Sequence, residues 1–356
     1  MSKIAIISGS LSRGGAERVS LYLADKLRTY HNETVLITTR IAEQEYLLPN
    51  GVKRINVVCS SYNVIGRLRK IIKSENPDLI LIMGTSNTTY AIPALWGLKK
   101  KVVVSERNSP THFAGRKITK WISRFLLRFA DGFVFQTQEV KEFYSILLKG
   151  RGVVIPNPLF LNNLIKPYNS DRKLRIVTAG RLVNQKNQAL LIKAFSMLLP
   201  KFPDYILEIF GEGPNRQKLQ LQIQQLGLQS KVFLRGNVED LFHRIIDASI
   251  FVMTSDFEGM PNALIEAMAL GIPCISSDCP SGGPRDLICH KVNGMLFPVG
   301  NCNELVSCMD YMLSDPKGSR SMGIEATKIR QKLDENLIIK EWNSYFSEIL
   351  KDTYNH

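Results

Sequence analysis

Long apolar runs are missing from this 356-residue chain. Its longest apolar stretches, such as residues 79–83 and 102–104, fall far short of the roughly 20 residues that a membrane-spanning helix needs. The first apolar run, residues 3–7, lacks the basic start, the longer core and the cleavage site of a signal peptide. We therefore expect a cytoplasmic protein.

Metal-binding cysteine patterns are also missing. The six cysteines include no pair with C-x2-C spacing, and no histidine pair completes a zinc site. The simplest interpretation is a set of reduced thiols in a reducing compartment.

Positive charge is abundant and unevenly placed. The formal net charge is +14, with 25 Lys/Arg and 11 Asp/Glu in residues 1–170, but 21 of each class in residues 171–356. Such an asymmetry favours an anionic partner for the first half: nucleic acid, an anionic membrane surface or a phosphorylated acceptor. A surface that only promotes solubility is the alternative. No zinc-finger, ribonucleoprotein-strand or helix-turn-helix signature is present, so we expect no nucleic acid.

Short apolar runs alternate with longer amphipathic segments, which is typical of parallel sheets covered by helices. The pattern pauses at Ile155-Pro-Asn-Pro158, whose prolines disfavour helix, and we assign the linker to residues 156–173. The alternating pattern predicts an α/β fold with domains at 1–160 and 174–335, and a C-terminal helix at 336–356 that packs back on the N-terminal domain. The expected strands are near residues 3–7, 33–38, 79–83, 102–105, 133–135, 174–179, 205–210, 231–234, 249–253 and 272–276.

A glycine-rich turn follows the first expected strand. Gly14 and Gly15 allow a ligand to approach the backbone closely, and the helix that follows offers free N–H groups to a phosphate. The spacing is not G-x-G-x-x-G, which argues against a nicotinamide-dependent oxidoreductase. An ordinary strand-to-helix turn is the alternative.

Two cations, Arg181 and Lys186, follow the strand at 174–179. This is the carboxyl end of a parallel strand, where open α/β sheets bind ligands, and two such cations suit a diphosphate. Taken alone, a loop with Arg and Lys is more often simply solvated.

The most specific motif runs from Phe257 to Pro273. Glu258 precedes a helix that Pro261 helps to begin, and Glu266 lies inside that helix. The N–H groups around residues 259–263 form an anion site at the helix N-terminus. Each acid alone could be a solvated surface charge, but the whole arrangement favours a site.

Taken in order, these three segments resemble family 4 of the retaining glycosyltransferases, which have the GT-B fold of two Rossmann-like domains facing across a cleft. The resemblance covers nearly the whole chain. Within the family, the chain is similar to bacterial enzymes of capsule, O-antigen or lipid-linked oligosaccharide assembly. It implies transfer of a hexose or N-acetylhexosamine from a nucleotide-diphosphate sugar, by family habit a UDP-sugar, to a lipid-diphosphate-linked glycan.

The same resemblance assigns roles to residues. It implies that Glu266 binds the donor ribose, that Glu258 contacts the transferred sugar, and that Arg181 and Lys186 bind the diphosphate. The implied catalytic residues are Glu258, Arg181 and Lys186, and the implied donor-binding set adds Gly14, Gly15, Arg107, Val238, Gly259, Met260, Pro261, Asn262, Ala263 and Glu266.

Arg107 departs from the family, because several relatives have histidine at that position. An arginine there binds diphosphate or an acidic acceptor group but cannot act as a titrating base at neutral pH. His112 is near in sequence but does not occupy the motif position.

No D-x-D motif is present to hold a divalent metal, so the resemblance implies a metal-independent enzyme without a cofactor. The alternatives are an inactive nucleotide-sugar-binding or regulatory protein of the same fold and an epimerase of that fold. The retained acids and cations favour transfer over both.

Residues 117–130 have the composition of an interfacial helix. Ile118, Trp121, Ile122, Phe125, Leu126 and Phe129 make an apolar face, and Lys117, Lys120, Arg124 and Arg128 lie largely elsewhere. The alternative is a helix that packs its apolar face on the sheet. The first interpretation predicts a protein held at the inner face of the cell membrane through its basic N-terminal half.

Overall fold

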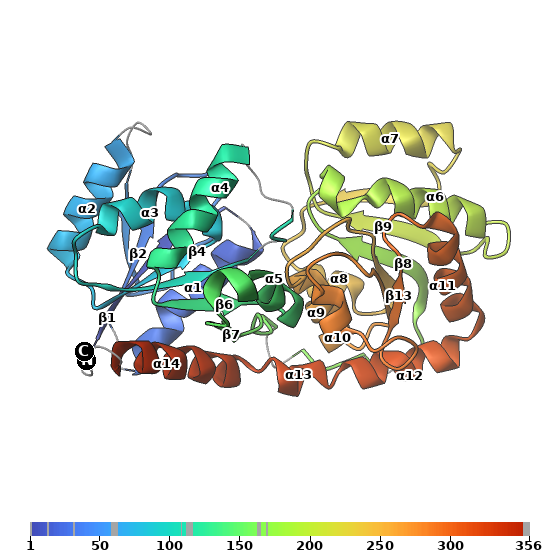
Figure 1. Cartoon of the computed structure of the whole chain (residues 1–356). Coiled ribbons are helices and arrows are strands. Elements are labelled where there is room, and N and C mark those ends of the chain that lie inside the picture. Colours follow the sequence, from blue (N-terminus) through green and yellow to red (C-terminus); the bar gives the residue numbers. More distant parts are fainter. Residues whose placement is uncertain are drawn as a thin grey trace. The chain divides into compact units, whose positions relative to one another are not determined.

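The computed structural model describes residues 2–12, 14–30, 33–57, 63–107, 109–111, 117–161, 165–168 and 170–351. Its chain divides into two compact units (Figure 1). Unit 1 comprises Met1–Pro158 together with Glu335–His356, and unit 2 comprises Leu159–Asp334. His112, discussed above, lies outside the described residues, as does part of the predicted linker.

Unit 1 is built on a parallel sheet with strand order β3-β2-β1-β4-β5-β6-β7. Its central strands are continuous apolar runs buried on both faces, as expected of a sheet covered by helices. The strands are β1 (Lys3–Ser8), β2 (Glu33–Thr38), β3 (Lys53–Asn56), β4 (Leu79–Met83), β5 (Lys101–Ser105), β6 (Gly132–Phe135) and β7 (Val153–Val154).

The connecting helices of unit 1 bury apolar residues against this sheet, Leu68 and Ile72 of α2 among them. These helices are α1 (Gly15–Lys26), η1 (Leu27–Tyr30), α2 (Val64–Glu75), η3 (Thr85–Asn87), α3 (Thr88–Leu95), α4 (Lys117–Leu126), η4 (Leu127–Phe129) and α5 (Gln138–Leu148).

The last helix, α14 (Glu335–Lys351), completes unit 1. The Tyr22 hydroxyl donates to the backbone carbonyl of Glu335, and the Phe133 N–H donates to the Tyr345 hydroxyl over 2.9 Å. Its buried residues repeat at helical spacing: Ile338, Ile339, Trp342, Tyr345, Phe346 and Ile349.

Unit 2 repeats the architecture with strand order β10-β9-β8-β11-β12-β13, again parallel. In both sheets the order reverses beside the first strand of the unit, and the carboxyl ends at such a reversal are where α/β sheets bind ligands. The strands are β8 (Lys173–Ala179), β9 (Ile206–Phe210), β10 (Val232–Gly236), β11 (Ala248–Met253), β12 (Cys274–Ser277) and β13 (Met295–Phe297).

Two buried clusters pack on this second sheet, one mainly of α6, α7 and α11 residues and the other centred on α9. The helices of unit 2 are η5 (Asn184–Lys186), α6 (Gln188–Leu198), α7 (Arg216–Gln225), α8 (Leu241–Ile245), α9 (Asn262–Ala269), α10 (Gly283–Leu287), α11 (Cys302–Ser314), α12 (Pro316–Ala326) and α13 (Ile329–Lys332).

The predicted α/β class and the two Rossmann-like sheets are confirmed. The ten predicted strands are all present, with ends that shift by two residues at most, whereas β3, β7 and β13 were not predicted. These three lie at or next to the sheet edges and are only two to four residues long, so their sequences carry little alternation.

Candidate active site

Two loops of unit 2 meet where its strand order reverses. One follows β8 and contains Gly180–Asn187, and the other follows β11 and contains Thr254–Glu258. Asp256 N–H donates to the Gln185 carbonyl over 2.8 Å, and Gln185 Nε2 donates to the Phe257 carbonyl over 2.8 Å. Asn187 Nδ2 also donates to Asp256 Oδ1 over 2.8 Å. These bonds hold the two predicted segments together at the ligand-binding edge of the sheet.

Lys186 and Glu258, both predicted site residues, form an ion pair at this junction. Lys186 Nζ lies 2.5 Å from Glu258 Oε1, and the two side chains are 21% and 10% exposed. The Thr254 hydroxyl lies within hydrogen-bonding distance of the Lys186 and Asn187 carbonyls, which fixes the backbone beneath the lysine. Partial burial of Lys186 and its ion pair with the Glu258 carboxylate hold the ammonium group in one position.

Arg181 is the exposed cation of the same loop. Within the described residues its guanidinium makes no hydrogen bond or ion pair, although its carbonyl accepts from Gln188 Nε2 over 3.0 Å. Gly180 precedes it, and a Cβ added there would lie 3.5 Å from Lys186 Cε. The aliphatic stem of Lys186 therefore lies at ordinary van der Waals distance from Gly180, with the exposed Arg181 side chain next in the loop.

Two glycines after β9 bring a third loop against the first. A Cβ on Gly211 would lie 2.1 Å from the Gly180 carbonyl oxygen, and one on Gly213 would lie 2.4 Å from that of Leu182. Side chains cannot be accommodated at such distances, so the close approach requires glycine. Sequence analysis missed both residues, although the G-x-G spacing directly after an expected strand was a signal for them.

One predicted acid, Glu258, precedes helix α9, and the other, Glu266, lies within it. Pro261 caps it in an extended conformation, so the helix begins at Asn262 rather than at the proline. Glu258 and Glu266 are 8% and 6% exposed, which excludes the solvated-surface interpretation for both. Leu264 and Met268 face the core.

The segment Gly259–Ala263 joins Glu258 to α9 and packs against the start of α10. A Cβ on Gly283 would lie 1.9 Å from the Gly259 carbonyl oxygen and 3.1 Å from Pro261 Cδ. Met260 and Pro261 are buried, while Gly259, Asn262 and Ala263 are partly exposed. Gly283 therefore sets the position of the segment, and it was not among the predicted site residues.

Val238, one of the predicted donor-binding residues, follows β10, which β9 and β8 separate from β11 in the sheet. It is partly exposed and packs against the core cluster of α9. Its strand and the strand that precedes Glu258 are therefore not neighbours in the sheet.

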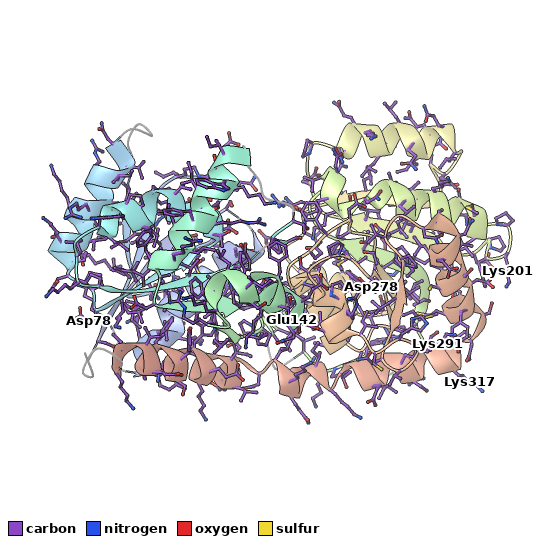
Figure 2. All side chains as sticks on the ribbon, viewed as in Figure 1. Asp78, Glu142, Lys201, Asp278, Lys291 and Lys317 are labelled. Carbon is purple, nitrogen blue, oxygen red and sulfur yellow. The ribbon has the colours of Figure 1, made fainter. Side chains whose placement is uncertain are left out.

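A pocket of about 540 Å³ adjoins the second loop, and Asp256, Asp278, Leu296 and Phe297 are among its lining residues. Asp278 lies just beyond β12 (Figure 2) and pairs with Arg285 over 2.9 Å. The two carboxylates make this pocket less favourable for a phosphate group than the loop that carries Arg181 and Lys186.

The predicted glycine-rich residues lie in unit 1. Gly14 caps α1 in an extended conformation, and Gly15 is the exposed first residue of that helix. The Glu17 carboxylate also lies at this helix end, since its Oε1 accepts from the Ser12 hydroxyl over 3.4 Å. A negative group already at the N-terminus makes this turn less favourable for phosphate than the sequence suggested.

Arg107 follows β5 and is 5% exposed. Its Nη1 donates to Asn157 Oδ1 over 3.0 Å, and its guanidinium lies 5.4 Å from the centroid of the Trp342 ring. Its Nε and Nη2 are buried without a hydrogen-bond partner among the described residues. Burial lowers the pKa of Arg107 to about 9. The side chain is therefore closed off from solvent, unlike Arg181.

Within the described ranges, no group of three or more His, Cys, Asp or Glu side chains is arranged to hold a metal ion. Among those same residues, no helix combines the length and the apolar character needed to cross a membrane.

Comparisons with known proteins cover both units. Residues 13–162 match the family model described as Glycosyltransferase Family 4, and residues 162–329 match the model described as Glycosyl transferases group 1. Unit 1 and unit 2 thus correspond to the two halves of one class of protein.

Two relatives span almost the whole chain. A protein of Haemophilus influenzae named an uncharacterized glycosyltransferase is 25% identical over 343 residues, which are 93% of this chain and 96% of the relative. An alpha-1,4-N-acetyl-D-galactosaminyltransferase of Campylobacter jejuni is 27% identical over 362 residues, 98% of this chain and 99% of the relative. The name of the second gives its acceptor as a trisaccharide on diphospho-undecaprenol.

A solved structure shares the fold. HepE of Anabaena, in complex with UDP-glucose, superposes with a TM-score of 0.83 at 20% sequence identity. The alignment covers 98% of this chain and 100% of that one.

Proposed function

Because the chain belongs to the family 4 glycosyltransferases with the GT-B fold, we propose that it transfers a hexose or N-acetylhexosamine from a UDP-sugar to a lipid-diphosphate-linked glycan. The transfer retains the anomeric configuration, needs no metal and serves bacterial surface polysaccharide or glycan synthesis. The donor binds to unit 2, at the carboxyl ends of β8 and β11.

One observation carries the donor assignment: an unpaired exposed cation, Arg181, and a positioned one, Lys186, share a loop at the reversal of strand order. Two such charges suit the paired phosphates of a nucleoside diphosphate, and Arg181 adds the planar fork that phosphate oxygens accept. The HepE complex supports a uridine donor, since a protein of the same fold binds UDP-glucose.

Glu258 in the loop before α9 and Glu266 within α9 hold the rest of the donor. Glu266, buried within the helix, accepts hydrogen bonds from the ribose hydroxyls, and Glu258 contacts the transferred sugar. Segment Gly259–Ala263 presents backbone N–H groups between them, and Val238 flanks the base.

The chemistry requires the bond between the anomeric carbon and phosphate to break as negative charge builds on the departing nucleoside diphosphate. Arg181 and Lys186 stabilise that charge more in the transition state than in the bound donor. They also take the place of a divalent metal. In front-face transfer the departing phosphate accepts the proton of the attacking hydroxyl, so no titrating base is needed on the protein.

The acceptor assignment rests on two observations. The Campylobacter relative is named for an undecaprenol-diphosphate-linked acceptor, and the net charge of residues 1–170 here is strongly positive. A lipid diphosphate supplies both an anionic group and a membrane tether. The protein therefore works peripherally at the inner face of the cell membrane, and the glycine turn at Gly14–Gly15 lies on the acceptor-binding unit.

A panel of nucleotide sugars tests the donor assignment by thermal shift and by release of nucleoside diphosphate. A donor at a hundred times its dissociation constant adds about 2.7 kcal/mol of stability, which is easily measured. We expect one UDP-sugar to stabilise the protein, and this shift to be lost in Glu266→Ala.

The cation pair is tested in the same assay. Arg181→Ala and Lys186→Ala should each raise the barrier by roughly 3–4 kcal/mol, a rate loss of a few hundredfold or more, with the fold intact. Lys193→Ala, which removes an exposed lysine from nearby α6, is the matched control and should retain full activity. Donor binding without turnover in the wild type would instead support an inactive binding protein.

A further inference from the structure

The apolar face of α4 points outward rather than onto the sheet. Ile118, Trp121 and Phe125 are 65%, 69% and 44% exposed, whereas Leu126 and Leu127 at the end of the helix are buried. The alternative in which residues 117–130 cover the sheet with their apolar face therefore holds only for those last residues. A soluble helix that exposes a Trp and a Phe needs an occupant for that face.

Neighbouring residues extend this face into an aromatic ridge, which we define as Trp96, Phe129, Phe125 and Trp121. Consecutive ring centroids along it are 5.4, 5.9 and 6.1 Å apart. Trp96 comes from the end of α3 and Phe129 from η4, so the ridge is formed by separate elements that hold it in place. All four side chains are exposed.

The charges beside the ridge have one sign. Residues 117–130 contain four Lys/Arg and no acid, and Lys99–Lys101 adds three more beside Trp96. The guanidinium of Arg128 lies 5.6 Å from the Phe125 centroid. The acids nearest in sequence lie on other elements: Asp131, which pairs with Lys101, the buried Glu106, which accepts from the Tyr144 hydroxyl over 3.3 Å, and Glu139 and Glu142 on α5.

Between α4 and α5 the ridge borders a groove of about 320 Å³. The Arg124 guanidinium lies there 5.1 Å from the centroid of the Phe143 ring. The groove combines two guanidinium groups with apolar walls and is lined by Trp121, Arg124, Phe125, Arg128, Phe143, Tyr144 and Leu147.

We propose that the aromatic ridge inserts into the interfacial layer of an anionic bilayer, where Arg124 and Arg128 contact lipid phosphates. Trp and Phe rings favour the boundary between acyl chains and headgroups, and each Lys or Arg near an anionic surface adds further attraction. A folded protein partner would need a matching acidic surface with an apolar centre, whereas a bilayer supplies both along the whole ridge. The inference extends the proposed function, because it names the surface that brings the enzyme to a lipid-linked acceptor.

The three tryptophans of the chain make a direct test. Trp96 and Trp121 belong to the ridge, while Trp342 is fully buried in unit 1. Vesicles of phosphatidylcholine and phosphatidylglycerol in equal parts, with brominated acyl chains, should quench Trp96 and Trp121 but not Trp342. In Trp96→Phe/Trp121→Phe protein the remaining fluorescence should be insensitive to these vesicles.

Variants separate the apolar and the charged contributions. Phe125→Ser/Phe129→Ser should lower the vesicle partition coefficient at least about tenfold, and Arg124→Gln/Arg128→Gln about thirtyfold at low salt. Leu221→Ser/Ile324→Ser removes two similarly exposed apolar side chains from unit 2 and is the matched control that should bind as the wild type does.

Three results would overturn the proposal: no quenching in the wild type, equal binding to pure phosphatidylcholine vesicles, or loss of binding in the control as large as in the ridge variants. A concentration-dependent dimer abolished by Phe125→Ser/Phe129→Ser would also overturn it and assign the ridge to a second copy of the chain. Vesicle binding is measured without nucleotide sugar, so it succeeds or fails independently of the donor assignment. The melting shift with donor should be unchanged in the ridge variants, which also shows that they fold.

Discussion

The ion pair between Lys186 and Glu258 means that the cation assigned to the diphosphate is neutralised when no donor is bound. A phosphate group that reaches Lys186 must compete with a carboxylate 2.5 Å away. Arg181 has no such competitor among the described residues. The two cations of one loop therefore differ in availability, and Arg181 is the first to attract an incoming diphosphate.

Replacing Glu258 with Gln should uncouple product affinity from turnover. The substitution frees Lys186, so we expect free UDP to bind roughly three- to tenfold more tightly, as befits the loss of a partly exposed ion pair. Turnover should nevertheless fall, because the substitution also changes the proposed contact to the transferred sugar. Titration calorimetry with UDP and a rate assay measure the two effects, and unchanged or weaker UDP binding would rule out the competition.

Burial of the charged Arg107 side chain lowers the stability of the folded protein by an amount that depends on pH. Burial lowers its pKa to about 9, so the folded protein binds this proton less tightly than the unfolded chain does. The resulting destabilisation is fully present below pH 9 and is relieved as the pH rises toward the ordinary arginine value of about 12.5.

Arg107→Met should therefore leave the free energy of unfolding at pH 7 unchanged or raise it by about 1 kcal/mol, because the relief from desolvation is partly offset by the lost attraction to the buried Glu106 carboxylate. No acceptor is abandoned, because Asn157 Oδ1 keeps a hydrogen bond of 2.7 Å from Gln136 Nε2. Urea unfolding should show the variant's advantage shrinking above pH 9. A loss of stability at pH 7 would mean that the contact with Trp342 outweighs desolvation.

At the scale of elements, Gly283 at the start of α10 packs closely against the segment that leads into α9. The Gly283 Cα leaves no room for a Cβ beside the Gly259 carbonyl. Gly283→Ala should displace segment Gly259–Ala263, cost about 1–3 kcal/mol of stability and lower turnover.

Gly66→Ala is the matched control for Gly283→Ala. Gly66 lies within α2, and nothing lies within 4 Å of an added Cβ. This change should stabilise the protein by up to about 1 kcal/mol, as alanine does in a helix. Thermal unfolding and donor turnover are measured for both variants. Equal effects in the two would mean that Gly283 does not position segment Gly259–Ala263.

The elements that sequence alone predicts are those whose own pattern determines them. The buried strand β4 is a continuous apolar run, and the face of α14 repeats at helical spacing, so both were predicted. The edge strand β3 is half exposed and depends on β2 for its conformation, so it was missed.

The predictability of the site follows the same division. Glu258 and Lys186 are chemically conspicuous, whereas the need for glycine at positions 211 and 283 arises only from backbone contacts made in the folded chain. The outward direction of the α4 apolar face was likewise undetermined, since period alone does not say which side of a helix meets the core.

At the scale of the whole molecule, unit 2 is inserted between two parts of unit 1. Trp342 is the largest fully buried side chain, and it reaches unit 1 from the far end of the chain. Trp342→Ala should destabilise unit 1 by roughly 3–5 kcal/mol. Hydrogen exchange should show β1 and β5 losing protection while β8 and β11 keep theirs, and uniform loss in both units would mean that they unfold together.

This order of segments also constrains biosynthesis. A ribosome completes every residue of unit 2 before it reaches α14. Unit 2 is therefore fully synthesised while unit 1 still lacks its last helix. Until residue 351 is made, the nascent chain exposes the surface that Trp342 and Phe346 later cover. The N-terminal half is translated first but stays incomplete until α14 is made. It is therefore the part of the chain that would most need a chaperone during synthesis.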